Sequence, residues 1–190
     1  MRDLDEKTMT LFVAPHPGGV VPRFEPSEGE PAHDRLITEM RSVYASLDIP
    51  PYLDAKAREM LEEGRETFRV LGLETRSLLL EEKHTHVFLW RGSEMCAVFS
   101  AALAMAGLKS GVHHLGVTVS DIDERELRPI LHTMSQMQAM DPADVADFVS
   151  NVKVGKFREQ VPEDLARALW ARRNQSAVAA VTDAARKAMT

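Results

Sequence analysis

The sequence contains a single cysteine, Cys96, and only 6% of its residues are aromatic. One cysteine rules out a disulfide within the chain and is typical of a protein from a reducing compartment. No stretch reaches the roughly 18 uninterrupted apolar residues of a membrane span, and the charged start lacks the apolar core of a secretion signal. Positive charge is also scarce, because 23 basic residues stand against 29 acidic ones, for a net charge of −6. These absences favour a cytoplasmic protein without a surface coated in DNA-binding charge.

The sequence does have enough apolar material for one ordinary domain, since 44% of its residues are hydrophobic and 27% are charged. Hydrophobic periodicity and turn residues divide the chain into four stretches. These are short strands within 10–24, a pair of helices over 31–72, a strand–helix–strand unit over 85–120 and further helices over 121–190. We therefore predict a single α+β domain, 1–190, in which about six or seven helices surround a small mixed β-sheet.

The strand–helix–strand unit is the most informative stretch. THVFLW (85–90) and HHLGVTVS (113–120) have the composition of strands, and EMCAVFSAALAMAG (94–107) has that of a helix. No charged residue occurs between Met95 and Leu108, so this helix is predicted to be buried on more than one side. A strand, a buried helix and a second strand suggest a right-handed crossover between parallel strands.

Residue types at the helix ends predict where several helices begin and stop. Asp54 and Ser93 are suitable N-caps, Asp121 with Glu124 matches a capping box, and Gly72 and Gly107 suit the position after a helix end. The second helix, over about 54–71, has a face that is predicted to be solvated. That face carries Arg58, Glu62, Glu63, Arg65 and Glu66.

Two short strings resemble parts of a nucleotide-binding site. Gly107-Leu108-Lys109-Ser110 has the composition of a P-loop end, but it leaves a helix instead of entering one. The acidic string at 123–126, DERE, sits where a helix begins, and acidic side chains there satisfy free N–H groups. Both strings are therefore interpreted as helix ends, and no ATPase motif or catalytic residue is predicted in this chain.

Four histidines form a second candidate site. His84 and His86 alternate onto one face of a predicted strand, and His113 and His114 begin another strand that is expected nearby. Imidazoles bind zinc, but this spacing matches no zinc signature, so strand-edge histidines are the simpler interpretation. Cys96 lies in the apolar helix, where burial makes a thiol inert.

Charge is unevenly distributed along the chain. Residues 1–150 contain 15 basic and 25 acidic residues, whereas residues 151–190 contain 8 basic and 4 acidic ones. In the second region, Lys153, Lys156 and Arg158 surround Phe157, a combination that suits phosphate contact with base stacking. Trp90 and Arg91 at a strand exit form a similar pair. The alternative for both groups is an aromatic anchor in the core beside solvated cations.

The order of several short motifs is similar to the C-terminal region of large DEAD/DEAH-box helicases of superfamily 2, including the Lhr-like ones. The motifs span roughly residues 10–175 and occur in the family's order. They are PHPGGVVPRF (15–24), AHDRLITEM (32–40), PPYLDAKAREMLEEGRETFRVLGL (50–73), FLWRG (88–92) and KVGKFREQVPEDL (153–165).

This resemblance implies a helicase-associated accessory domain beside two RecA-like motor domains, in cis or in trans. ATP and Mg²⁺ would be bound by the parent protein and no cofactor by this chain. Nucleic-acid contacts are an expectation for the positions in these motifs and the charged cluster. They are Arg23, His33, Arg35, Trp90, Arg91, Lys153, Lys156, Phe157 and Arg158.

Other readings stay open at this point. His33, Asp34 and Arg35 also suit a helix N-terminal cap. The whole chain also suits a free-standing protein-interaction module without nucleic acid, or a small enzyme that uses the four histidines.

Overall fold

The computed structural model describes residues 3–5, 10–12, 31–152 and 158–189. The sequence predicts one domain, and the chain divides into two compact units, Met1–Glu30 and Pro31–Thr190. The first unit has an antiparallel pair of strands, β1 (Asp3–Asp5) and β2 (Thr10–Phe12). β2 coincides with the first predicted strand, while the second, at 20–24, lies outside the described residues.

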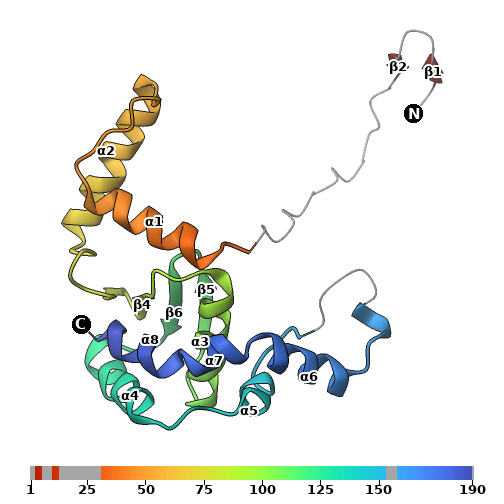
Figure 1. Cartoon of the computed structure of the whole chain (residues 1–190). Helices are drawn as coiled ribbons and strands as arrows, with labels where there is room; N and C mark the ends of the chain where they lie inside the picture. Colours follow the sequence, from red (N-terminus) through yellow and green to blue (C-terminus); the bar gives the residue numbers. More distant parts are fainter. Residues whose placement is uncertain (1–2, 6–9, 13–30, 153–157, 190) are drawn as a thin grey trace. The chain divides into compact units, whose positions relative to one another are not determined.

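The larger unit is built on a four-stranded sheet with the order β3-β4-β6-β5 (Figure 1). Its strands are β3 (Leu78–Glu81), β4 (His84–Phe88), β5 (Ser110–His113) and β6 (Gly116–Ser120). Each hydrogen-bonded pair of neighbours in this sheet is antiparallel. The α+β class is confirmed, and the sheet is antiparallel where a mixed one was expected.

The crossover prediction needs a correction at 113–120. This stretch contains the end of β5 and all of β6, because the chain reverses at His114 and Leu115 between them. β4 and β5 are both antiparallel to β6, so they run parallel with β6 between them. Apolar alternation continues through the turn, which is why the pattern alone reads as one strand.

Helix α3 (Ser93–Met105) lies against the sheet and occupies the centre of the core. It contacts β5 and β6 on one side and α5, α7 and α8 on others, as Figure 1 shows. Cys96, Val98, Phe99 and Leu103 are fully buried. The prediction of a helix buried on more than one side is confirmed.

Seven further α-helices occur among the described residues. They are α1 (Asp34–Ala45), α2 (Ala55–Val70), α4 (Glu124–Gln136), α5 (Pro142–Ala146), α6 (Glu163–Arg173), α7 (Gln175–Ala179) and α8 (Val181–Ala188). Over those same residues, none of the helices has the length and apolarity needed to cross a membrane.

The helix ends agree with the sequence in part. Asp54 caps α2 by accepting from the Ala57 N–H at 2.7 Å, and Gly72 and Gly107 have φ values of +67° and +82°. The capping box lies two residues later than predicted. It pairs Asp123 with Glu126, because α4 begins at Glu124. The string at 123–126 is thus a helix cap, as expected.

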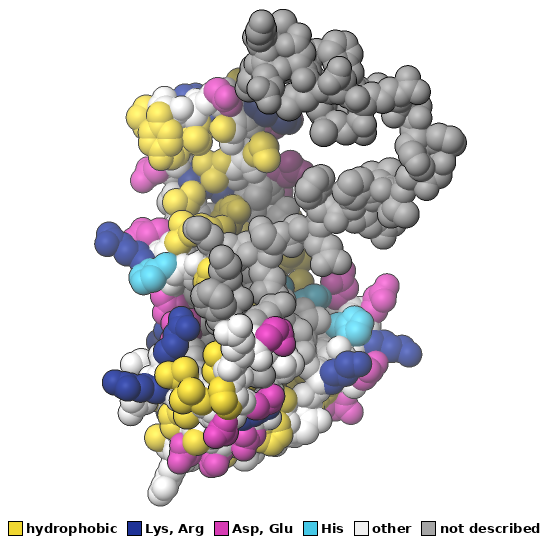
Figure 2. Space-filling view, turned by 90° about the vertical axis from the view of Figure 1, so that its right-hand side faces the viewer, with side chains coloured by type: hydrophobic (Ala, Val, Ile, Leu, Met, Phe, Trp, Pro, Cys, Tyr) yellow, Lys and Arg dark blue, Asp and Glu magenta, His cyan; other side chains and the backbone are white. Residues whose placement is uncertain are grey.

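Helices α1 and α2 form a hairpin that packs on its own small cluster. Ile37, Phe68, Leu73 and Trp90 are buried there. The Tyr44 ring crosses α2 at Gly64, where a Cβ would lie 2.9 Å from the ring. Figure 2 shows that hydrophobic side chains also remain exposed on the upper part of the molecule, over this hairpin.

Candidate functional site

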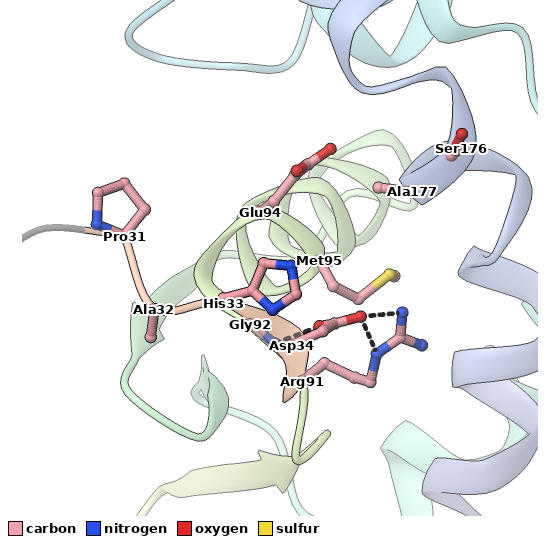
Figure 3. Close-up of a pocket in the computed structure, with 10 residues that line it drawn as sticks. All are labelled: Pro31, Ala32, His33, Asp34, Arg91, Gly92, Glu94, Met95, Ser176 and Ala177. Atoms are coloured by element: carbon pink, nitrogen blue, oxygen red, sulfur yellow. Dashed lines mark hydrogen bonds and ion pairs between the residues drawn. The ribbon is translucent and has the colours of Figure 1, made fainter. Parts of the chain in front are cut away.

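A cavity of about 330 Å³ opens where the N-termini of α1 and α3 meet (Figure 3). Three parts of the chain line it: the residues that lead into α1, the stretch from Arg91 into the first turn of α3, and α7. The lining residues are Pro31, Ala32, His33, Asp34, Arg91, Gly92, Glu94, Met95, Ser176 and Ala177. Two of the predicted contact residues, His33 and Arg91, are therefore brought together.

An ion pair joins the two segments across this cavity. Arg91 Nε and Nη2 donate to Asp34 Oδ2 at 2.8 and 2.6 Å, and the Gly92 N–H donates to Asp34 Oδ1. The hydrogen bond from Arg91 is the main reason why the pKa of Asp34 lies below its usual value. The same bond raises the pKa of Arg91. Both oxygens of this carboxylate are thus used to hold the structure.

Two hydrogen bonds between Ala32 and Ser93 join the same two segments. The Ala32 N–H donates to Ser93 Oγ at 2.9 Å, and the Ser93 N–H donates to the Ala32 carbonyl at 2.9 Å. Ser93 was expected to cap α3, but the N-cap is Gly92 and the Ser93 hydroxyl binds Ala32. A Cβ on Gly92 would lie 2.5 Å from the Ala32 carbonyl oxygen. We call these contacts, from Ala32, Asp34, Arg91, Gly92 and Ser93, the clasp.

His33 and Arg35 lie at the edge of the clasp. His33 is the N-cap of α1, and its Nδ1 accepts from the Arg35 N–H at 3.2 Å. The Arg35 side chain is exposed and lies 4.0 Å from Glu39. The alternative reading of residues 33–35 as a helix cap is therefore correct for His33. Because Asp34 pairs with Arg91 and Glu94 also lines the cavity, the cavity has no excess of positive charge.

For Trp90 the structure agrees with the alternative interpretation, an aromatic anchor in the core, and not with the predicted nucleic-acid contact. Only 4% of its surface is exposed, and its ring packs edge-on against Phe68 at 5.6 Å and Tyr44 at 6.5 Å. Arg41 lies over the ring at 5.7 Å. A ring enclosed in this way cannot stack on a nucleic-acid base, so Trp90 is corrected to a core anchor of the α1–α2 hairpin.

The second predicted contact region is not placed. Arg23, Lys153, Lys156 and Phe157 lie outside the described residues, and Arg158 begins a short 3₁₀ helix, η1 (Arg158–Gln160).

Three of the four candidate histidines gather on one face of the sheet. His86 lies 5.9 Å from His113 between ring centroids, and it contacts Glu81 Oε2 and Thr118 Oγ1, each at 2.9 Å. His84 faces the same side two residues before His86. His114 lies in the turn between β5 and β6. In the part of the chain that the structure describes, no three His, Cys, Asp or Glu residues are arranged to hold a metal ion.

The surroundings of His113 predict that the stability of the fold depends on pH. Burial, together with the nearby His86, lowers the pKa of His113 below its usual 6.5. Its Nδ1 accepts from the Leu115 N–H at 3.2 Å, so the ring must stay neutral there. As the pH falls below the unfolded-state pKa, the unfolded chain takes up a proton at His113 more readily than the folded chain does, and stability decreases.

We therefore expect the free energy of unfolding, measured in urea, to fall between neutral pH and pH of about 5. His113→Gln should remove part of that slope, whereas the same change at exposed His132 should preserve it. An unchanged slope in His113→Gln would show that this ring contributes nothing.

The clasp can be tested by Asp34→Asn, which keeps the shape but removes the charge. We expect the free energy of unfolding to fall by only about 1 kcal/mol. The side chains of Asp34 and Arg91 are 42% and 33% exposed, so solvent screens the pair. The lowered pKa of Asp34 means that its contribution is present above the unfolded-state pKa of 3.8 and is lost as the pH falls.

Urea unfolding at neutral and acidic pH measures both effects, and the difference between wild type and variant should shrink in acid. Glu39→Gln, at the exposed pair with Arg35, should change stability by less than about 0.5 kcal/mol. Equal losses in the two variants would contradict a special role for the clasp.

Of two other buried residues, Cys96 agrees with the sequence prediction and Arg65 does not. Burial raises the pKa of the Cys96 thiol to about 11, in agreement with an inert cysteine. Arg65, expected on a solvated face, has only 5% of its surface exposed. Its spacing of four from Leu61 and three from Phe68 places it on the apolar stripe of α2, and that signal could have located it.

Comparison of the chain with protein-family models, with curated proteins and with solved structures finds no match.

Proposed function

We propose that this chain is a cytoplasmic accessory domain of a DEAD/DEAH-box helicase-like protein and that it contacts the motor domains without turnover of its own. ATP and Mg²⁺ would be used by the motor. The observation that carries the proposal is the concentration of exposed, large apolar side chains on the α1–α2 hairpin. They are Leu36, Val43, Leu47, Ile49, Tyr52, Met60 and Val70.

An exposed apolar surface of this kind marks a protein-interaction site more often than a nucleic-acid site. The charges agree with this choice, because the chain is acidic overall and Arg91, a predicted phosphate contact, is paired with Asp34. A polyanion gains little from an arginine whose charge is already compensated.

The clasp supports the kinship on which the proposal depends. AHDRLITEM and FLWRG are separate motifs in the sequence, and their residues Asp34, Arg91 and Gly92 bind one another. This contact puts the two motifs in one structural unit, as a single accessory domain requires.

A second candidate is nucleic-acid binding through the basic C-terminal region. Residues 151–190 contain twice as many basic as acidic residues, and Arg172 and Arg173 are exposed at the end of α6. With this function, the domain would guide a nucleic-acid strand toward the motor domains and would not dock on those domains.

Titration of the chain with a two-domain RecA-like motor fragment of a DEAD/DEAH-box helicase tests the proposal. We expect a complex in size-exclusion chromatography and a changed rate of ATP hydrolysis by the fragment, with none by the chain alone. Fluorescence anisotropy with single-stranded and duplex DNA and RNA forms the parallel arm.

Nucleic-acid binding that weakens with salt by about 0.7–0.9 logarithmic units per phosphate contact, without motor binding, would replace the proposal by the second candidate. Absence of both interactions would contradict a helicase accessory role altogether.

A further inference from the structure

The loop between α1 and α2 exposes three large apolar side chains close together in the sequence. Leu47 is 87% exposed, Ile49 is 45% exposed and Tyr52 is 83% exposed. Hydrophobic side chains are gathered at this end of the hairpin in Figure 2. We call these three residues the loop surface.

Arg65 fixes the backbone of this loop from the inside. Its Nε and Nη2 donate to the Val43 carbonyl at 3.0 and 2.9 Å. Nη2 also donates to Ser46 Oγ at 2.9 Å and to the Asp48 carbonyl at 2.7 Å. A buried guanidinium therefore binds the last turn of α1 and the start of the loop at once. The charge also suits the negative end of the helix.

A fixed loop that exposes large apolar side chains is prepared for binding. Ordering a mobile loop opposes association, and a loop that is already ordered avoids most of that cost. Tyrosine is also among the residues that most often dominate binding energy at protein interfaces. Packing among the described residues leaves the side chains of Tyr52 and Leu47 uncovered.

The segment that carries the loop surface is acidic, and Arg69, which lies near Leu47, is paired with Glu66. Residues 47–63 contain Asp48, Asp54, Glu59, Glu62 and Glu63 against two basic residues, Lys56 and Arg58. Lys56 is paired with Glu59 at 2.8 Å, and Arg58 donates to the Leu53 carbonyl. Over the described residues, no cation forms an ion pair with Asp48, Glu62 or Glu63.

We infer that the loop surface docks into an apolar groove flanked by lysine or arginine on a partner protein. The inference deepens the proposed function, on whose protein contact it rests, by naming the chemistry of the partner surface. Asp48, Glu62 and Glu63, which we call the acidic rim, attract basic side chains on a partner and repel acidic ones. A second copy presents the same acidic rim, so like charges oppose a symmetric contact between two loop surfaces.

The first test uses two synthetic amphipathic helical peptides as probes. Both have one leucine stripe, which is flanked by lysines in the first and by glutamates in the second. The whole chain should bind the lysine peptide at least about tenfold more tightly, and the preference should decrease as salt is raised. Equal affinity for the two peptides would overturn the inferred partner chemistry.

The second test changes the loop surface itself. Leu47→Ser with Tyr52→Ser should weaken binding of the lysine peptide by at least about tenfold, and the fold should survive because both side chains are exposed. Leu165→Ser, at a residue 50% exposed on α6 and outside the α1–α2 hairpin, is the matched control and should bind normally. Glu62→Lys with Glu63→Lys should shift the preference toward the glutamate peptide. Unchanged binding in both double variants would overturn the site.

Outcomes for the motor and for the loop surface are distinguishable. If the motor fragment binds equally well to wild type and to the Leu47→Ser, Tyr52→Ser variant, the inference fails and the proposed function stands. If the lysine peptide binds at the loop surface but the motor fragment does not bind, the proposed function fails. Sedimentation showing a dimer that is lost in that variant would replace the basic partner by a second copy.

Discussion

Arg65→Met is expected to lower the free energy of unfolding by about 2–4 kcal/mol. Methionine fills a similar space, but it leaves the Val43 and Asp48 carbonyls without the donors that Arg65 provides. The loop between α1 and α2 would then lose its fixed conformation while the core around α3 persists. Urea unfolding gives the stability, and hydrogen exchange over residues 43–54 gives the loop's order.

Arg69→Met is the matched control on the same helix. Arg69 is 58% exposed and pairs with Glu66 at 3.0 Å. An exposed pair of this kind contributes less than about 1 kcal/mol, so the control should remain close to wild type. If the two variants lose the same stability, or if the loop exchanges no faster in Arg65→Met, Arg65 does not hold the loop.

Gly116→Ala is expected to lower the free energy of unfolding by about 3 kcal/mol or more, or to prevent folding. A Cβ at this position would lie 1.8 Å from the Val87 carbonyl oxygen on the neighbouring strand, far inside contact distance. The atom that blocks it belongs to the backbone of β4, so no side chain can move aside. Soluble yield and urea unfolding measure the effect.

Gly111→Ala tests the same substitution on the adjacent strand. Nothing lies within 4 Å of a Cβ there, so this variant should fold with nearly normal stability. Gly111 on β5 pairs with Thr118 on β6, so this control substitution lies in the same sheet as Gly116. A well-folded Gly116→Ala protein would mean that the packing between β4 and β6 is looser than described.

Local patterns were sufficient for much of this fold. The uncharged run between Met95 and Leu108 predicts α3 and its burial, because a helix without a polar face must be covered on several sides. Asp54, Gly72 and Gly107 mark helix ends through their own backbone and side-chain preferences, and the structure has them in those positions.

Features that depend on residues far apart in the sequence could not be predicted from local patterns. The clasp joins residues that are 57 and 61 positions apart, and no local pattern signals that Ser93 binds Ala32 instead of capping α3. The sequence leaves Trp90 either as a base-stacking ring or as an anchor in the core, and the rings of Tyr44 and Phe68 from the hairpin, which enclose it, show that it is the anchor. Arg65 was assigned by charge alone, and the loop that it binds lies outside its own helix.

Backbone hydrogen exchange of the chain, with and without the motor fragment, tests the central claim most directly. We predict slower exchange over residues 46–54 in the complex and little change in α6 (Glu163–Arg173). Slower exchange confined to α6 and the residues around it, or no change anywhere in the chain, would contradict docking through the α1–α2 hairpin.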